Sequence, residues 1–434
     1  MSIRSSFARR PGISRLGTPS RNLVFAAVLL SILAPEALAQ ADSAGGGNQV
    51  HTLADSLAGA VGGVAVDRAG FIYSADFLDK VWRISPSGEA EVFAEGLYGA
   101  SGNAIDARGR LLQSNFYGDT ISRIDRLGNH EVIAEGLGGP VGLALDPEGN
   151  LFVCNCRTNS IGKVTSQGEV STFAESELFS CPNGITRGAQ GDLFVVNFSN
   201  GKMLKVSPEG QVSDFATIPG GGNGHVAMAR GSLYATSFRG HRVYRVSNDG
   251  EVTLVAGTGV MGEKDGTAKE ALFSWPNGIA AGPLGDRLYV NDFINRAPPG
   301  VAVPPSPRFS LRQVKLASLS DLLTQAEASG GIEQVVEIHR AWKADPATAG
   351  LFTEMEINRL GYSWMGAGKL ALAIRLFELN VESYPQSFNV YDSLAEAYMN
   401  AGKKKLAIEN YEKSLELNDA NTNARDKLEE LRGD

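Results

Sequence analysis

Three asparagines stand in similar short contexts, and their side-chain oxygens are suited to binding a small ligand or a hard cation. Asn183 and Asn277 lie in Pro-Asn-Gly, and Asn223 lies in Gly-Asn-Gly. An amide oxygen can accept a hydrogen bond from a ligand or coordinate Ca²⁺. Asparagine before glycine also starts turns well. The sequence therefore leaves two interpretations open, a ligand-binding role and a turn-forming role.

A histidine follows one of these asparagines at a distance of two residues. His225 comes directly after Asn223-Gly224, whereas His51 and His241 lie in other parts of the pattern described below. A zinc site needs several converging ligands, so one histidine is not sufficient for it. His225 could act as a single acid or base, or it could be a hydrogen-bonded interior residue.

A phrase that recurs six times must position these side chains. It reads Gly-apolar-Ala-apolar-Asp-x-x-Gly and is followed by short stretches of alternating apolar and polar residues between turns. A period of roughly 40–45 residues with four short strands is typical of a β-propeller blade. We therefore predict an all-β propeller of six blades over residues 49–316. The copies begin at Gly63, Gly102, Gly142, Gly184, Gly224 and Gly278.

The two ends of this region are expected to close the ring. The sixth repeat has no outer strand after its third strand, which we place at Leu311–Leu316. A segment with the pattern of an outer strand precedes the first repeat, at Gln49–Leu53. If Gln49–Leu53 completes the last blade, no sheet edge is left unpaired.

The repeat places several polar side chains near one mouth of the central channel. The residue before each repeat glycine should point at that mouth, and two polar residues follow the glycine where other blades have apolar ones. We predict that these positions line a ligand site. They are Ser101, Asn103, Asn183, Asn223, His225 and Asn277.

The three cysteines leave their pairing open. Cys156 stands where the other five blades have phenylalanine, and Cys181 precedes an inner strand. A bridge from Cys181 to Cys156 or to Cys154 is possible, and small buried thiols are the other interpretation. The spacing lacks the paired cysteines of a metal site.

The N-terminal segment has the layout of a signal peptide. Residues 1–22 contain five Arg and no acidic residue, Leu23–Ala34 is a mostly apolar run of twelve residues, and Ala37-Leu38-Ala39 is a cleavage site. We predict a signal peptide at residues 1–39, and hence a periplasmic or extracellular protein without a membrane span after cleavage. An uncleaved anchor is the alternative. Cleavage removes five Arg and one Glu and takes the net charge from −8 to −12, which disfavours nucleic acid as a partner.

The character of the chain changes after a Pro-rich insertion at residues 297–308 in the sixth repeat. Residues 318–434 show a helical period, and Glu354–Ser387 matches Phe388–Asn421 at an offset of 34 residues. This pattern resembles tetratricopeptide (TPR) repeats, which pack as antiparallel helix pairs. We predict an all-α module that contacts a protein partner, a second copy of the chain or the propeller.

The propeller region resembles NHL-repeat proteins and the gluconolactonase and luciferin-regenerating group (SMP-30-like) of six-bladed propellers, most clearly at Val255–Ala280. In the gluconolactonase-like family a Glu, an Asn and an Asp hold a divalent metal. By position the Asn corresponds to Asn183 and the Asp to Asn223, while the Glu position falls near Gly62. Calcium held by Asn183 and Asn223 is what this resemblance implies, without either carboxylate.

Two functions follow from these observations. The first is recognition of a small polar molecule at the channel mouth of an exported protein, with protein contacts through the helical module. The second is a metal-dependent lactonase-type hydrolase, or a lyase, with a site poor in carboxylates. Because both carboxylates are missing, we expect the first function.

Overall fold

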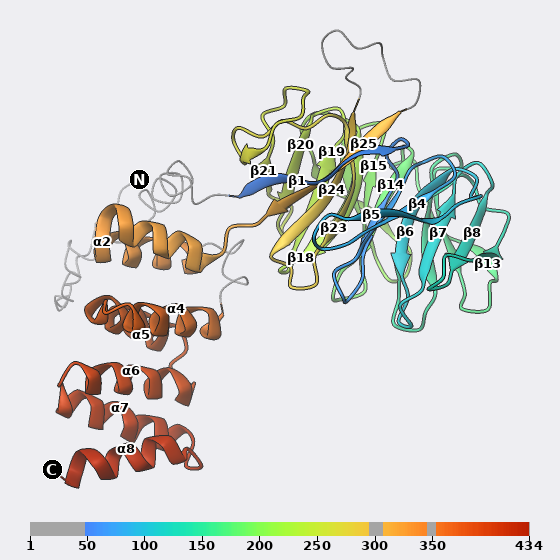
Figure 1. Cartoon of the computed structure of the whole chain (residues 1–434). Helices are drawn as coiled ribbons and strands as arrows, with labels where there is room; N and C mark the ends of the chain where they lie inside the picture. Colours follow the sequence, from blue (N-terminus) through green and yellow to red (C-terminus); the bar gives the residue numbers. More distant parts are fainter. Residues whose placement is uncertain (1–47, 295–306, 345–352, 434) are drawn as a thin grey trace, which may run out of the picture.

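The chain folds into a propeller followed by a column of helices (Figure 1). The computed structural model describes residues 48–294, 307–344 and 353–433. The predicted signal peptide, residues 1–39, lies outside the described residues, as does nearly all of the insertion at 297–308. Among the described residues, no helix is both long and apolar enough to span a bilayer.

The propeller has six blades, as the repeat predicts, and each of the first five is a four-stranded antiparallel sheet. Blade one contains β2 (Val64–Val66), β3 (Ile72–Ala75), β4 (Val81–Ile84) and β5 (Ala90–Ala94). Blade two contains β6 (Ala100–Ile105), β7 (Leu111–Asn115), β8 (Thr120–Ile124) and β9 (His130–Ala134). Blade three contains β10 (Pro140–Leu145), β11 (Leu151–Asn155), β12 (Ser160–Val164) and β13 (Val170–Glu175). In each blade the first strand is the innermost and the fourth is the outermost.

The remaining blades continue the ring. Blade four contains β14 (Pro182–Arg187), β15 (Leu193–Asn197), β16 (Lys202–Val206) and β17 (Val212–Thr217). Blade five contains β18 (Asn223–Ala229), β19 (Ser232–Ser237), β20 (Arg242–Val246) and β21 (Val252–Ala256). Blade six contains β23 (Pro276–Ala281), β24 (Arg287–Ile294), β25 (Arg308–Lys315), β1 (Gln49–Ala58) and the short β22 (Gly266–Thr267). Apolar side chains between adjacent blades form the buried clusters of the propeller.

The N-terminal strand closes the ring, as the sequence predicts. β1 pairs antiparallel with β25, so the outer part of blade six comes from the start of the described chain. A buried ion pair holds this junction. Arg312 is only 1% exposed, and its guanidinium bonds Asp292 at 3.1 Å and Asp265 at 2.7 Å. Asp265 in turn accepts a hydrogen bond from the backbone N–H of Thr52 at 2.8 Å, which ties β1 to the same cluster.

Blade five departs from the other blades by one residue. In blades two, three and four, the residue paired with the last residue of the second strand is Ala or Pro, and in blade six Pro276 pairs with Asp292 near that end, whereas in blade five the residue is Asn223. The ideal Cβ of Gly184 would meet the Cα of His225, just as that of Gly142 would meet the Cα of Gly184. His225 therefore takes the position of the repeat glycine, and the assignment of Gly224 to that position is wrong by one residue.

The reason for this offset lies in the first turn of blade five. Arg230 and Gly231, both with positive φ, form a two-residue turn between Ala229 and Ser232. Blades one to four have five residues there, as between Ile105 and Leu111 in blade two. The glycine spacing in the sequence looks the same in all blades, but Gly231 belongs to a different turn. Gly224 consequently occupies the mouth position, and Asn223 lies one step before it.

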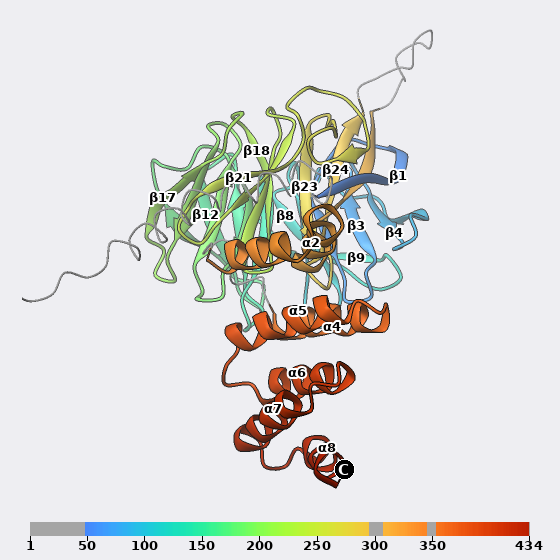
Figure 2. The ribbon, with the colours of Figure 1, turned by 90° about the vertical axis from the view of Figure 1, so that its left-hand side faces the viewer.

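The helices stack in a column that begins next to the propeller at α2 and extends away from it (Figures 1 and 2). They are α2 (Leu319–Ala344, kinked at Gly331), α4 (Glu354–Gly366), α5 (Leu370–Ser383), α6 (Phe388–Asn400), α7 (Lys404–Leu417) and α8 (Thr422–Gly433). The pair α6–α7 follows the pair α4–α5 at an offset of 34 residues. Their apolar faces share one core, which includes Trp364 and Phe377. At the junction, Ala317 donates to Asn48 and accepts from Arg230 of the propeller.

Candidate binding site at the channel mouth

A pocket of about 340 Å³ lies at the end of the propeller where the inner strands begin. Its wall is an incomplete ring of phenylalanines, each from the same position after or near the end of the second strand of its blade. The five rings come from Phe77, Phe116, Phe198, Phe238 and Phe293. Ala60, Val61 and Val141 complete the apolar surface. The fold thus brings one large apolar side chain from each of five blades to the same opening.

The aromatic rings support one another around the opening. The ring centroids of Phe77 and Phe116 are 5.5 Å apart, and those of Phe198 and Phe238 are 5.4 Å apart. Trp275 packs on the outer side of Phe238 at 5.1 Å. Aromatic pairs at such distances stabilise each other beyond their burial. The wall is therefore a preformed surface built from neighbouring blades.

A disulfide fills the sixth position of the ring. Cys156 stands where the other blades have phenylalanine, and it is bonded to Cys181 of blade four. Of the two pairings that the sequence left open, this is the one formed, and Cys154 remains a buried free thiol. Burial raises the pKa of Cys154 well above its ordinary value. Both half-cystines line the pocket, so blades three and four are covalently joined at the mouth.

Asn183 and Asn277 have the same geometry in two different blades. Each side chain is 8% exposed and donates its NH₂ to backbone carbonyls of the next blade. Asn183 bonds the carbonyl of Gly224 at 2.7 Å, and Asn277 bonds the carbonyls of Val61 and Gly62 at 2.9 and 3.0 Å. Among the described residues neither Oδ1 accepts a hydrogen bond, although both residues line the pocket. These two oxygens, with Ser101, are the polar atoms available to a ligand.

Three other residues predicted for this site lie away from the pocket lining. Asn103 bonds the carbonyl of Tyr73 at 3.2 Å, in the interior between blades one and two. Asn223 is fully buried and donates its amide to the carbonyl of Lys202 at 3.3 Å. The convergence of Asn223 with Asn183 and Asn277 does not occur, because the one-residue offset of blade five moves it from the mouth position.

His225 lies inside the channel wall, in the repeat-glycine position of blade five. Its backbone N–H donates to the hydroxyl of Thr236 at 3.0 Å, and its Nε2 is buried without a hydrogen-bond partner among the described residues. Burial lowers the pKa of this imidazole to about 4. The side chain is therefore neutral near pH 7, and it is not one of the residues that line the pocket.

The pocket is uncharged, while its outer side carries two cations. Among its described lining residues there is no Asp, Glu, His, Lys or Arg. Arg157 lies over the ring of Phe116 and pairs with Asp119, and Arg239 lies over Phe198. A divalent cation prefers several oxygen ligands that include carboxylates. The donors at this mouth are neutral, and no three His, Cys, Asp or Glu side chains of the described chain gather as metal ligands, so the residues do not fit the calcium site of the resemblance.

Two mouth residues have a backbone conformation that side chains rarely adopt. In blades two to six the position before the inner strand has positive φ, and blades two, three and five have glycine there: Gly99, Gly139 and Gly222. Blades four and six instead have Cys181 (φ 51°) and Trp275 (φ 59°). Such a conformation costs roughly 1 kcal/mol or more for a residue with a side chain. Both exceptions place their side chains against the aromatic ring, one in the disulfide and one on Phe238.

The aromatic wall is the feature of the pocket that the prediction missed. The sequence signal was visible, because phenylalanine recurs at one position in five blades and cysteine replaces it in the sixth. The sequence analysis used that position only for the cysteine pairing and did not include the phenylalanines in the predicted site. A residue that follows the second strand of every blade must lie at the same end as the inner-strand starts, and this geometry places it in the mouth.

Comparison with known proteins agrees with this architecture. Residues 43–256 match the model of the Virginiamycin B lyase family. A protein of unknown function from Bacteroides thetaiotaomicron is 16% identical with a TM-score of 0.51, covering 62% of this chain and 76% of that one. A gluconolactonase from Xanthomonas campestris is 17% identical with a TM-score of 0.49, covering 62% of this chain and 89% of that one.

A further solved structure belongs to the enzyme after which the family is named. A virginiamycin B lyase from Staphylococcus aureus is 16% identical with a TM-score of 0.44, covering 62% of this chain and 99% of that one. No curated protein sequence matches the chain. The likeness to the Bacteroides thetaiotaomicron structure, at 16% identity, shows the fold alone. Residues 43–256 of this chain are similar in sequence to the Virginiamycin B lyase family.

Proposed function

We propose that the channel mouth binds a small, largely apolar organic molecule that donates hydrogen bonds to Asn183 and Asn277. The observation that carries this proposal is the lining of the pocket, which has five phenylalanines, a disulfide and no ionisable side chain. A volume of 340 Å³ lies in the range of small-molecule sites. A strongly polar ligand would lose its hydration against these rings. This proposal departs from the small polar molecule that the sequence analysis predicted, because the lining is mostly apolar.

The polar atoms of the mouth favour a ligand with hydrogen-bond donors. The amide NH₂ groups of Asn183 and Asn277 are occupied by backbone carbonyls. Their orientations are thereby fixed, and each amide can offer only its oxygen. Two fixed acceptors in an apolar pocket select a molecule with an O–H or N–H group, because an unsatisfied buried oxygen costs free energy.

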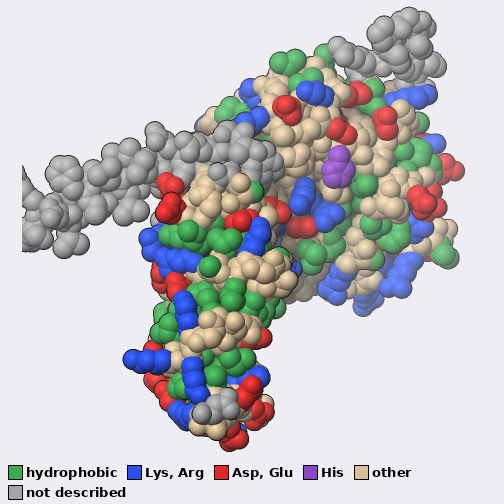
Figure 3. All heavy atoms as spheres, turned by 60° about the vertical axis from the view of Figure 1, so that its left-hand side comes forward, with side chains coloured by type: hydrophobic (Ala, Val, Ile, Leu, Met, Phe, Trp, Pro, Cys, Tyr) green, Lys and Arg blue, Asp and Glu red, His purple; other side chains and the backbone are tan. Residues whose placement is uncertain are grey.

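Two further features belong to the same proposal. The disulfide Cys156–Cys181 would persist in an oxidising compartment, which supports export through the signal-like residues 1–39. The helical module carries Lys or Arg and Asp or Glu side chains interspersed over one face (Figure 3). We propose that this module contacts a protein partner, with packing and mixed charge pairs rather than one dominant charge.

Filling the pocket tests the binding role. Ala60 lines the mouth and is half-buried, so Ala60→Phe should occupy the pocket without changing the blade cores. Ala58, exposed at the end of β1, provides the matched control Ala58→Phe. A panel of phenols and aromatic amides should raise the melting temperature of the wild type and of Ala58→Phe by mass action, and should leave Ala60→Phe unshifted. Equal shifts in Ala60→Phe would show that the molecules bind elsewhere.

The family match keeps a second candidate in view, which is lyase or lactonase chemistry on the bound molecule. The acid or base that our sequence analysis identified, His225, is neutral and buried, and it does not line the pocket. An assay of lactone opening, with and without calcium, tests this candidate. Turnover that disappears in His225→Gln and in Ala60→Phe would establish catalysis at the mouth. Turnover that both variants retain would exclude the mouth as its site.

A further inference from the structure

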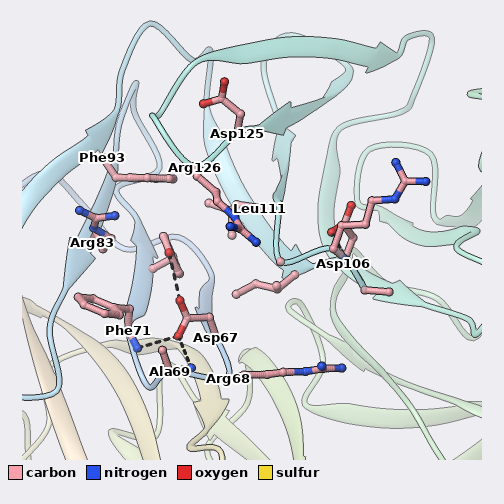
Figure 4. A pocket seen from close by; sticks show the side chains of 15 residues that line it. Asp67, Arg68, Ala69, Phe71, Arg83, Phe93, Asp106, Leu111, Asp125 and Arg126 are labelled. Atoms are coloured by element: carbon pink, nitrogen blue, oxygen red, sulfur yellow. Dashed lines mark hydrogen bonds between the residues drawn. The ribbon is translucent and has the colours of Figure 1, made fainter.

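A second pocket lies on the face of the propeller opposite the mouth, between blades one and two. It has a volume of about 470 Å³ and is formed by the turns β2–β3, β6–β7 and β8–β9 (Figure 4). We call it the inter-blade groove. Its aromatic side includes Phe71, Tyr73 and Phe93, and Leu111 lies at its floor. The guanidinium of Arg83 lies over the rings of Phe71 and Phe93, at 5.5 and 5.3 Å from their centroids.

The acidic side chains of the groove are used by their own turns. Asp67 accepts hydrogen bonds from the backbone N–H groups of Ala69 and Phe71, both at 2.9 Å. Asp106 and Asp125 do the same in the turns of blade two, each accepting two backbone N–H groups. Asp106 is also bonded by the side chain of Arg110 at 2.7 Å. These carboxylates are therefore turn residues that are already partnered.

Unlike these carboxylates, three arginines of the groove have no charged partner within the part of the chain that the structure describes. Arg68, Arg108 and Arg126 all line it, are exposed, and form no ion pair with any described residue. Figure 4 shows Arg68 extending from blade one and Arg126 from blade two into the space between the blades. Arg83, by contrast, pairs with Glu91. Three unpaired guanidinium groups beside an aromatic wall provide donors for an anion and an apolar surface for its carbon skeleton.

The repeat itself provides a control for this cluster. The turn between the first and second strands and the turn between the third and fourth strands recur in the other blades. Their tips carry Pro147-Glu148, Ser166-Gln167, Ala189-Gln190, Pro208-Glu209, Asn248-Asp249 and Pro283-Leu284. None of these is basic. The tip Arg230 of blade five is bonded to the carbonyl of Ala317. A structural role of the turn would repeat in each blade, so the free arginines of blades one and two need another explanation, particularly in a chain with net charge −8.

We infer that the inter-blade groove is a binding site for a small organic polyanion, a molecule with two or more carboxylate or phosphate groups on an apolar skeleton. Arg68, Arg108 and Arg126 bind the anionic groups, and Phe71, Tyr73 and Phe93 contact the skeleton. This site is independent of the mouth, which is uncharged and lies at the other end of the propeller. The two sites therefore differ in the chemistry of their ligands.

Calorimetric titration of the full chain at low ionic strength tests this inference. The probes are benzene-1,3,5-tricarboxylate, naphthyl phosphate and inorganic pyrophosphate, which separate carboxylate from phosphate and test the need for an apolar skeleton. At least one aromatic anion should bind more tightly than pyrophosphate, and its affinity should fall as salt is raised. The variant Arg68→Gln, Arg108→Gln, Arg126→Gln should bind it at least 30-fold more weakly.

A matched control removes three exposed cations outside the groove. It combines Lys264→Gln, Arg308→Gln and Lys404→Gln. Binding should stay within threefold of the wild type in this control and in Ala60→Phe, which affects only the mouth. Unchanged binding in the groove variant, or an equal loss in the control, would overturn the inference, since the anions would then respond to surface charge alone. If the triple groove variant fails to fold, Arg126→Gln alone should still weaken binding at least threefold.

Discussion

The two ends of the propeller use the same repeat in different ways. At the mouth, equivalent positions from all six blades converge, and the ring of five phenylalanines is completed by a disulfide. At the inter-blade groove, only the turns of blades one and two contribute, and their arginines have no counterpart with the same freedom in the other blades. The mouth is thus a product of repetition, whereas the groove is a local departure from it.

This difference has a consequence for stability. Several mouth residues also join two blades, as Asn183 and Asn277 do through backbone carbonyls of the next blade. Arg68, Arg108 and Arg126 are exposed turn residues whose side chains form no ion pair with any described residue. Changes at the mouth should therefore affect both binding and folding, and changes in the groove should affect binding alone. The predictions below are ordered by the size of the expected effect.

The largest effect is expected from the disulfide. Cys156 and Cys181 are 25 residues apart, and opening a loop of this length should lower the free energy of unfolding by about 3 kcal/mol. We expect this loss in Cys156→Ser, Cys181→Ser, measured by urea unfolding. The variant Cys156→Phe, Cys181→Gly should recover part of it, because other blades have phenylalanine and glycine at these positions. A loss below 1 kcal/mol in the serine variant would mean that the joint between blades three and four does not depend on the bond.

The next effect is a pH dependence caused by His225. Burial lowers the pKa of this histidine to about 4 in the folded chain, against about 6.5 when unfolded. Between these values the unfolded chain binds more protons, so stability is complete above pH 6.5 and falls as the pH drops toward 4. His225→Gln should remove a fall of on the order of 3 kcal/mol between pH 7 and pH 4. Parallel stability curves for the wild type and the variant would contradict the burial of a neutral imidazole.

The fold could be predicted from the sequence because a repeat of six copies averages out local errors. The closing strand followed from the count of strands, since blade six lacked an outer strand and the segment from Gln49 supplied it. The position of His225 could not be predicted in this way. Gly224 and Gly231 reproduce the glycine spacing of the other blades, and the shorter turn is revealed by the strand register, in which Ala229 pairs with Ser232.

The candidate site was predicted in part for a related reason. Ser101, Asn183 and Asn277 line the mouth, as their place before the repeat glycine indicated. The aromatic wall comes from second strands, and its convergence depends on how neighbouring blades face one another. The groove was not predicted at all, because Arg68, Arg108 and Arg126 are far apart in sequence and are each ordinary as turn residues.

A smaller effect is expected when an amide of the mouth is removed. In Asn277→Ala the carbonyl of Val61 loses its side-chain donor, and the carbonyl of Gly62 loses one of two donors, the other being Asn291. The loss should be about 2 kcal/mol in the free energy of unfolding, because the carbonyls are left in a buried place. The control Arg126→Gln, in the inter-blade groove, should stay within about 0.5 kcal/mol. Equal losses in the two variants would remove the contrast between the mouth and the groove.

The smallest expected effect separates the free-energy cost of the backbone conformation at the mouth from the contribution of the side chain. Trp275 has φ of 59°, in a position where three other blades have glycine, and its ring packs on Phe238. Trp275→Gly and Trp275→Ala both remove this packing, but only alanine keeps a Cβ in the left-handed region. Trp275→Ala should therefore be less stable than Trp275→Gly by about 1 kcal/mol, although alanine normally stabilises a chain relative to glycine.

Thermal unfolding of the two variants under identical conditions measures this difference directly. The hydrogen bond from the backbone N–H of Trp275 to Nδ1 of His241, at 3.2 Å, involves no atom that either substitution removes, so it cancels in the comparison. If the alanine variant is as stable as the glycine variant, the backbone can leave the left-handed region without cost. The packing of Trp275 on Phe238 would then depend on side-chain contacts alone. The positive φ at this position would not be needed to hold the tryptophan there.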